Sequence, residues 1–312
     1  MIIDAPRGTR SSRHLLDVDG MTGAEIGRLL DLAVEMRADR AARRRRSLLE
    51  SETIGLAFYE ASTRTRVSFE LAAKALGATV VDLAIAGSSA GKGESLVDTL
   101  RTLERTGVTA LVLRHAASGA PYLAARSTGM AIVNAGDGMH AHPTQALLDL
   151  LTLRESLGAL DGRMVAIIGD VTHSRVARSV IHAIRAVGGR VRVGGPPAWV
   201  AGFATWDGVA TCTTIEDALD GADAVMALRV QRERAAGGGI PSIGAYARAW
   251  RVDDERMRLT APGAPIMHPG PTNEGVELTA ELANGPRSLI GRQVENGVPV
   301  RMAVLATVAG AV

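Results

Sequence analysis

The sequence predicts an α/β protein of two domains, each a parallel sheet flanked by helices. At 312 residues the chain is long enough for two domains of ordinary size, each with its own core. In the first half, an apolar run from Thr53 to Phe58 is followed by a helical pattern ending at Gly77 and by a second run from Thr79 to Leu83. A strand, a helix and a strand in this order form a unit whose strands are parallel. The alternation continues in the second half, with strands expected at 164–170, 190–193 and 222–228.

Composition and charge exclude several classes of protein. Hydrophobic residues make up 46% and charged residues 22% of the chain, as in ordinary soluble globular proteins. The net charge of +2 is too small to indicate a nucleic-acid-binding protein, despite a pI near 9.0. No apolar run approaches the roughly 20 residues of a membrane span, and the first residues lack the apolar segment of a signal peptide. We therefore expect a cytoplasmic protein with no membrane or nucleic-acid partner.

Other features of the sequence narrow the structure further. Cys212 is the only cysteine, which excludes an intrachain disulfide and a metal site built from several cysteines. Residues 1–12 are polar and predict an irregular segment, whereas apolar spacing predicts a helix from Ala24 to Arg40. The four arginines Arg43–Arg46 continue that helix, which favours a solvated helix end over a polyanion site.

A cluster of hydroxyls and guanidiniums separates the strand at 53–58 from the helix after it. A helix N-terminus has unpaired N–H groups and a positive dipole end, so it can bind an anion. The alternative is an ordinary helix cap with two solvated arginines. We favour a phosphate site, to which Ser62, Thr63 and Thr65 add hydroxyl donors and Arg64 supplies a forked cation.

This cluster carries a family resemblance. Ser62–Arg66, followed by Ser68-Phe69-Glu70, resembles the phosphate-binding motif of the aspartate and ornithine carbamoyltransferases. The resemblance implies that Ser62, Thr63, Arg64 and Thr65 hold the phosphate of carbamoyl phosphate, with Arg64 and Thr65 also acting in catalysis. The motif alone does not separate the members of the family.

The glycine- and serine-rich stretch from Gly87 to Thr99 predicts a surface loop. In aspartate members of the family, a similar loop with Lys-Gly-Glu reaches into the active site of a neighbouring subunit. The resemblance therefore implies that Lys92 contacts the amino-acid carboxylate, and that Ser88 or Ser89 contacts the phosphate. It also implies a homotrimer, or a multiple of it, with active sites shared between subunits.

Three further residues of the first half match the family. Arg114 ends the strand expected at 111–115, at the carboxyl edge where parallel sheets bind ligands, although such an arginine can also be solvent-facing and idle. Pro143 suits the first position of a helix, leaving His142 and Gln145 at its mouth. The resemblance assigns Arg114 to the phosphate and carbonyl oxygen, His142 to the same carbonyl oxygen, and Gln145 to the carbamoyl NH2.

The second half supplies the expected aspartate site. The loop after the strand at 164–170 lacks a Gly-x-Gly-x-x-Gly pattern, which argues against dinucleotide binding. It resembles instead the loop in which aspartate members bind the α-carboxylate, through Arg175 here. The same members hold the β-carboxylate and the amine with the pair corresponding to Arg229 and Gln231. An enzyme for the cationic ornithine would pay several kcal/mol for an arginine at that place.

The turn His268–Glu277 completes the set. By resemblance, the backbone carbonyls of Pro269 and Gly270 bind the carbamoyl NH2, whereas Glu274 stands where many bacterial members have arginine. The resemblance also implies that a C-terminal helix, about 295–312, packs on the first domain. We expect a carbamoyl-phosphate domain at 1–142, completed by that helix, and an aspartate domain at 143–294.

The resemblance spans essentially the whole chain and is strongest to the aspartate members. It implies transfer of the carbamoyl group of carbamoyl phosphate to L-aspartate, giving N-carbamoyl-L-aspartate and phosphate on the route to pyrimidines. No metal, cofactor or covalent intermediate is implied. Two alternatives stay open: a carbamoyltransferase for another amino acid, such as a diamino acid, and a non-catalytic family member. Association with a regulatory chain or another enzyme of the pathway also stays open.

Overall fold

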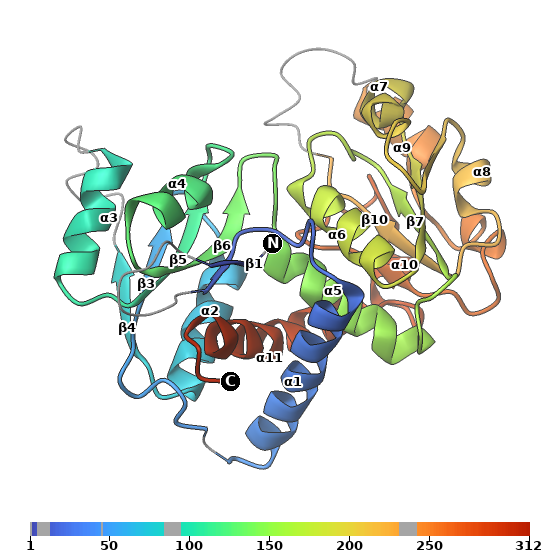
Figure 1. Ribbon diagram of the computed structural model, residues 1–312. Helices are drawn as coiled ribbons and strands as arrows, with labels where there is room; N and C mark the ends of the chain where they lie inside the picture. The colour runs from blue at the N-terminus through green and yellow to red at the C-terminus, as the bar shows by residue number, and fades with distance from the viewer. Residues whose placement is uncertain (1, 5–12, 45, 84–94, 231–241) are drawn as a thin grey trace. The chain divides into compact units, whose positions relative to one another are not determined.

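The computed structural model describes residues 2–4, 13–44, 46–83, 95–230 and 242–312 (Figure 1). The chain divides into two compact units. Unit 1 comprises Met1–Leu147 and Asn296–Val312, and unit 2 comprises Leu148–Glu295. Each unit has a sheet of its own, so the two are described separately.

The strands of unit 1 are β1 (Ile2–Asp4), β2 (Arg13–Leu15), β3 (Thr53–Phe58), β4 (Thr79–Leu83), β5 (Ala110–His115) and β6 (Ala131–Asp137). In the described part of the unit they form one six-stranded sheet in the order β1-β2-β6-β5-β3-β4. Neighbouring strands are parallel except β1 and β2, which pair antiparallel at one edge. The interiors of β3 and β5 are runs of buried apolar residues, as expected for strands covered on both faces.

The helices of unit 1 are α1 (Gly23–Ala41), α2 (Thr63–Ala75), α3 (Leu96–Arg105) and α4 (Ala120–Ser127), with the start of α5 (Pro143–Leu157) and the end of α11 (Ile290–Val308). Thr22 and Glu25 form a reciprocal capping box that begins α1. Leu100 of α3, Leu111 of β5 and Ile132 of β6 belong to one buried cluster, which packs α3 on the sheet. Figure 1 shows these elements.

Unit 2 is a second parallel sheet with its own core. Its described strands are β7 (Met164–Ile168), β8 (Arg190–Gly194), β9 (Val209–Cys212), β10 (Ala224–Ala227) and β11 (Ile266–Met267), in the order β11-β10-β7-β8-β9. Its helices are α6 (Arg175–Ala186), α7 (Pro197–Val200), η3 (Ala201–Phe203), α8 (Ile215–Leu219), α9 (Ile243–Trp250), η4 (Arg256–Arg258) and α10 (Ala280–Asn284). Tyr246 and Trp250 of α9 are buried in a cluster with Ile168 of β7.

The strand order reverses once in each sheet, and this fixes where a ligand can bind. In unit 1 the chain passes from β3 to β4 on one side, and then to β5 and β6 on the other. In unit 2 it passes from β7 to β8 and β9, and then returns to β10 and β11. Open parallel sheets bind ligands at the carboxyl ends of the strands where the order reverses. The expected ligand edges are therefore the carboxyl ends of β3 and β5, and of β7 and β10.

The predicted fold class is confirmed, with a parallel sheet and flanking helices in each unit and with the end of α11 in unit 1. The helix expected at Ala24–Arg40 is α1, and the strands expected at 53–58 and 79–83 are β3 and β4. Within the described ranges, no helix has the length and apolar character needed to cross a membrane.

Several boundaries differ from expectation. Residues 2–4 are not irregular, because they pair with β2 as an edge strand. Helix α11 begins at Ile290, earlier than the expected start near 295. Strands β7 and β10 end sooner than predicted, at Ile168 and Ala227.

The arginines after α1 also differ from expectation, because they follow the helix instead of extending it. Helix α1 ends at Ala41, and Arg44 and Arg46 fold back to pair with Asp39. Their charge is therefore partly balanced by the helix itself, which agrees with a structural and not a polyanion-binding role.

Candidate active site

The predicted phosphate cluster lies at the carboxyl edge of unit 1, where α2 begins. Ser62 is the N-cap of α2 in an extended conformation, and its side chain makes no capping hydrogen bond. The first turn of α2 contains no acidic residue. Thr65 is buried, whereas Thr63 and Arg64 are exposed. The helix thus presents a positive dipole end and hydroxyl donors without a competing carboxylate in its first turn, which suits an anion.

The two arginines of the cluster have different surroundings. Arg66 pairs with Asp82 of β4, so the Asp82 carboxylate balances its charge. Partial burial lowers the pKa of the Arg64 guanidinium from its ordinary value, yet an arginine remains cationic at neutral pH. Arg64 is therefore the better candidate to contact a bound phosphate.

Arg114 lies beside this cluster. It is the penultimate residue of β5, and its register partner on the neighbouring strand is Phe58, the last residue of β3. The Arg114 Nη1 donates to the Ala135 carbonyl at 3.3 Å, and its Nε lies 3.6 Å from Oε2 of Glu60. These contacts hold the guanidinium at the point where the strand order reverses.

His142 and Gln145 follow the third adjacent strand, β6. His142 is 4% exposed, and its carbonyl accepts from the N–H groups of Gln145 at 3.1 Å and Ala146 at 3.2 Å, which begins α5. The structure therefore brings the described phosphate-site candidates of unit 1 to the carboxyl ends of three neighbouring strands, β3, β5 and β6. An anion, a carbonyl oxygen and an amide can all be contacted at such an edge.

Arg175 and Arg229 lie at the corresponding edge of unit 2. Arg175 is the first residue of α6, directly after the loop that follows β7, and is 5% exposed. The Ser174 hydroxyl caps α6 by accepting from the Ala177 N–H at 3.2 Å. Arg229 is half-buried two residues after β10, the strand that pairs with β7. Two guanidiniums therefore follow the two strands between which the order reverses.

The turn at Pro269 and Gly270 follows β11 and is fixed by buried polar groups. The Gly270 N–H donates to Nδ1 of His268 at 2.8 Å, and the His268 N–H donates to Oε1 of Gln293 at 3.0 Å. The Gln293 amide in turn donates to Oδ1 of Asp149 at 2.7 Å. No periodic pattern in the sequence predicts these supporting residues, because they come from three separate segments.

The other predicted site residues lie in the segment 88–92, at position 231, and in the stretch after Gly270. Ser88, Ser89, Lys92 and Gln231 lie outside the described residues. Glu274 is exposed in the segment after the Pro269–Gly270 turn. In the ranges that the structure describes, no group of three or more His, Cys, Asp or Glu side chains is arranged to hold a metal ion.

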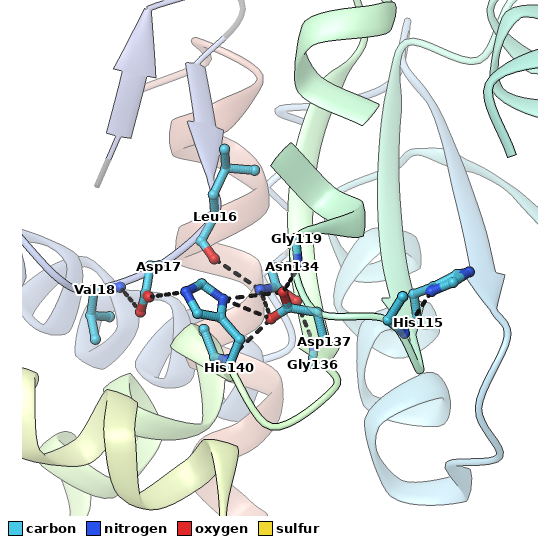
Figure 2. A network of polar contacts seen from close by, with 11 residues as sticks. Leu16, Asp17, Val18, His115, Gly119, Asn134, Gly136, Asp137 and His140 are labelled. Carbon is cyan, nitrogen blue, oxygen red and sulfur yellow. Dashed lines mark hydrogen bonds and ion pairs between the residues drawn. The ribbon is translucent and has the colours of Figure 1, made fainter. Parts of the chain in front are cut away.

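Sequence reasoning also missed a polar network beside His142. Asp17, Asn134, Asp137 and His140 contact one another in unit 1, as Figure 2 shows. A signal was present in the polar residues within β6 and just after it. The contact between Asp17 and His140, however, joins positions 123 residues apart in the sequence, and no local pattern contains it.

Comparison with known families now assigns the fold. The family model described as aspartate/ornithine carbamoyltransferase, carbamoyl-P binding domain, matches residues 13–155. The model described as aspartate/ornithine carbamoyltransferase, Asp/Orn binding domain, matches residues 161–308. The chain belongs to the aspartate/ornithine carbamoyltransferase family.

Individual relatives favour the aspartate branch of this family. The aspartate carbamoyltransferase catalytic subunit of Gluconacetobacter diazotrophicus is 50% identical over 309 residues, covering 97% of this chain and 96% of that one. The protein of the same name from Pelotomaculum thermopropionicum is 48% identical over 299 residues, covering 96% of this chain and 97% of that one.

Solved structures share the fold across both branches. Aspartate transcarbamoylase from Trypanosoma cruzi, in complex with N-(phosphonacetyl)-L-aspartic acid, has a TM-score of 0.84 at 31% identity over 94% of this chain and 95% of that one. Ornithine carbamoyltransferase from Thermus thermophilus has a TM-score of 0.83 at 30% identity over 95% of this chain and 98% of that one. The fold alone therefore does not distinguish the two amino acids.

Proposed function

We propose that the chain is an aspartate carbamoyltransferase, which transfers the carbamoyl group of carbamoyl phosphate to the α-amine of L-aspartate. The observation that carries this proposal is the near full-length similarity, at about half identity, to catalytic subunits of that name. The geometry agrees, because each unit places the matching candidate residues at the edge where its strand order reverses.

The unit 1 edge binds carbamoyl phosphate in this proposal. Ser62, Thr63, Arg64 and Thr65 hold the phosphate at the N-terminus of α2, where N–H groups and hydroxyls donate to its oxygens. Arg114 contacts both the phosphate and the carbonyl oxygen. Gln145 binds the carbamoyl NH2, so the carbonyl carbon is presented in one orientation.

The reaction is an acyl transfer without a covalent enzyme intermediate. The neutral amine of aspartate forms a bond to the carbonyl carbon, and the carbonyl oxygen becomes negative. Thr65, Arg114 and His142 stabilise that oxyanion, which lowers the barrier more than it stabilises the ground state. The bond from carbon to the phosphate oxygen then breaks, and the leaving phosphate takes the proton lost by the amine.

Selection of aspartate is assigned to the arginines of unit 2. Arg175 binds the α-carboxylate and Arg229, with Gln231, binds the β-carboxylate and orients the amine; Lys92 adds a further cation. Charge-assisted hydrogen bonds from an arginine to a carboxylate are the stronger kind in proteins. A cationic side chain such as that of ornithine would meet like charge at the same place.

We further propose a homotrimer or a multiple of it, located in the cytoplasm and acting in pyrimidine synthesis. The name of the relatives, catalytic subunit, supports an assembly of several chains. The resemblance of the Ser88–Lys92 segment supports active sites shared between subunits. The domain limits, 1–142 with the C-terminal helix and 143–294, likewise stay a proposal about where each substrate binds.

The first test is phosphate release from carbamoyl phosphate with L-aspartate, L-ornithine and 2,3-diaminopropionate supplied separately. We expect turnover with L-aspartate alone, and the same preference in the variant Glu274→Arg, because Glu274 is exposed. Turnover with a diamino acid would contradict the substrate, and a Glu274→Arg variant that gains aspartate turnover would identify the residue responsible. Absence of turnover with all three would indicate a non-catalytic member.

A further inference from the structure

The loop that carries His142 is closed on itself by Asp137 (Figure 2). The Asp137 N–H donates to the Ala141 carbonyl at 3.1 Å, and the Ala141 N–H donates to Oδ1 of Asp137 at 3.1 Å. The Gly119 N–H donates to Oδ2 at 2.7 Å, and the Asn134 amide donates to Oδ1 at 2.8 Å. Asp137 is fully buried. This carboxylate therefore fixes the residue immediately before His142.

The donors from Gly119, Asn134 and Ala141 are uncharged, so a neighbouring positive charge would stabilise this buried carboxylate further. The imidazole of His140 can supply one, since its Nδ1 lies 3.1 Å from Oδ2 and 3.3 Å from Oδ1 of Asp137. The His140 side chain is 40% exposed, so it exchanges protons with solvent readily.

A second carboxylate faces the other ring nitrogen. The Nε2 of His140 lies 3.6 Å from Oδ2 of Asp17, a buried residue whose Oδ1 accepts from the Val18 N–H at 2.7 Å. Figure 2 shows the ring between the two carboxylates. A neutral imidazole carries one N–H and can donate to one of them, whereas the imidazolium donates to both.

Tyr122 also packs against the His140 ring. The ring of Tyr122 of α4 packs edge-on against His140, with 5.7 Å between ring centroids. Burial, and then the charges of Asp17, Asp137 and Asp19, raises the pKa of Tyr122 to about 12. The elements that surround His140, namely the segment before α1, the end of β6 and α4, therefore contribute the carboxylates of Asp17 and Asp137 and a neutral phenol.

We propose that His140 is a positioning residue, whose imidazolium clamps Asp137 to Asp17 and thereby holds the His142 loop ready for carbamoyl phosphate. Loss of the proton leaves the two carboxylates without their shared cation, and the loop then loosens. The KM for carbamoyl phosphate should therefore rise as pH rises through the titration of His140. This inference rests on the proposed function for its kinetic readout, but not for its structural one.

The test compares the pH dependence of kcat and KM in the wild type, His140→Asn and Asp17→Asn. The control is His182→Asn, whose histidine packs against Trp206 in unit 2. We expect His140→Asn to raise the KM for carbamoyl phosphate at low pH by about fivefold, the effect of losing one partly exposed ion pair, and to remove the pH-dependent rise. Asp17→Asn should move the midpoint of that rise to lower pH, and the control should keep the wild-type profile.

A direct reading of protonation separates this inference from the proposed function. In a chain labelled with ¹⁵N-histidine, the signal lost in His140→Asn should titrate in the wild type, and at lower pH in Asp17→Asn. Wild-type pH profiles in both variants, or an His140 titration unaffected by Asp17→Asn, would overturn the proposal. If the wild type released no phosphate from carbamoyl phosphate, the proposed function would fail while the nitrogen titration would still decide the clamp.

Discussion

In the proposed function, Arg229 is the residue on which the choice of amino acid depends most directly. Arg229 follows β10, the strand that pairs with β7. In the proposed function its side chain holds the β-carboxylate of aspartate. Removing a hydrogen bond to a charged group costs about 1.5–3 kcal/mol, which is roughly 10- to 100-fold in an equilibrium or rate ratio. We therefore expect Arg229→Gln to lower kcat/KM for aspartate by that factor, with little change in the KM for carbamoyl phosphate.

The matched control for Arg229 is Arg185→Gln, also in unit 2. Arg185 lies in the last turn of α6 and pairs with Asp207 at 2.6 Å, where Asp207 is largely exposed. An exposed pair of this kind contributes about 0–1 kcal/mol to stability and should leave the kinetics unchanged. An equal loss of activity in both variants would indicate a general effect on unit 2 and not a lost contact with aspartate.

At this scale the sequence predicted which residues to examine but not what surrounds them. Arg114, Arg175 and Arg229 could be selected because each follows an apolar run and matches a family motif. The contacts of Arg114 with Glu60 and Ala135 could not, since they join separate segments through the fold. The same holds for His140, whose two carboxylate neighbours are set by β6 and by the segment before α1.

Among the elements, β2 shows how a three-residue strand can be held in place by a side chain. His14 of β2 is 1% exposed, and its Nδ1 accepts a hydrogen bond from the Ile132 N–H of β6 at 3.0 Å. Burial lowers the pKa of His14 below its ordinary value of 6.5. The unfolded chain therefore binds a proton at a higher pH than the folded chain does, and stability should fall as pH decreases below about 6.5.

Thermal unfolding can be measured from about pH 5 to about pH 8, a range that brackets the ordinary pKa of histidine. The measurement can therefore isolate this effect. In His14→Gln the group that takes up the proton is gone, so the difference in stability between the wild type and the variant should shrink as pH falls. A difference independent of pH would show that His14 does not titrate on unfolding. His182→Gln is the control, because its half-buried ring lies on Trp206 and not in the β2–β6 ladder.

Elements with long periodic patterns could be predicted, whereas short or interrupted ones could not. The α1 pattern and the apolar runs of β3, β4 and β5 are long enough to be recognised. Strand β1 has three residues and acquires its structure from pairing with β2. The early start of α11 was missed because the helix contains Gly291 and Pro299, residues that normally indicate a break.

The molecule as a whole repeats one arrangement in two units. The alternation of strands and helices predicted parallel sheets, but it could not give the strand order, which depends on which neighbour each strand finds. The order matters most for function, because it places the phosphate cluster beside Arg114 in unit 1 and Arg175 near the end of β10 in unit 2. In each unit the candidate residues therefore lie at the same topological position.

The proposed assembly can be tested by complementation between inactive chains. Lys92→Ala removes a group that, in the proposal, each subunit donates to its neighbour, and His142→Ala removes a group that each site takes from its own chain. Either variant alone should be nearly inactive. In a trimer assembled at random from equal amounts of both, a site is intact when its own chain keeps His142 and the neighbour keeps Lys92. About one quarter of the sites should meet both conditions, by the arithmetic of a closed ring.

Recovery of about one quarter of wild-type activity after the two variants are dissociated and reassembled together would therefore support shared sites. A charged tag on one variant would show by native electrophoresis that mixed oligomers had formed. If mixed oligomers form and activity does not return, Lys92 acts within its own chain or not at all, because no arrangement of the two chains would then rebuild a complete site. Mixing Lys92→Ala with Arg114→Ala should give the same recovery, since Arg114 belongs to the same unit 1 edge as His142.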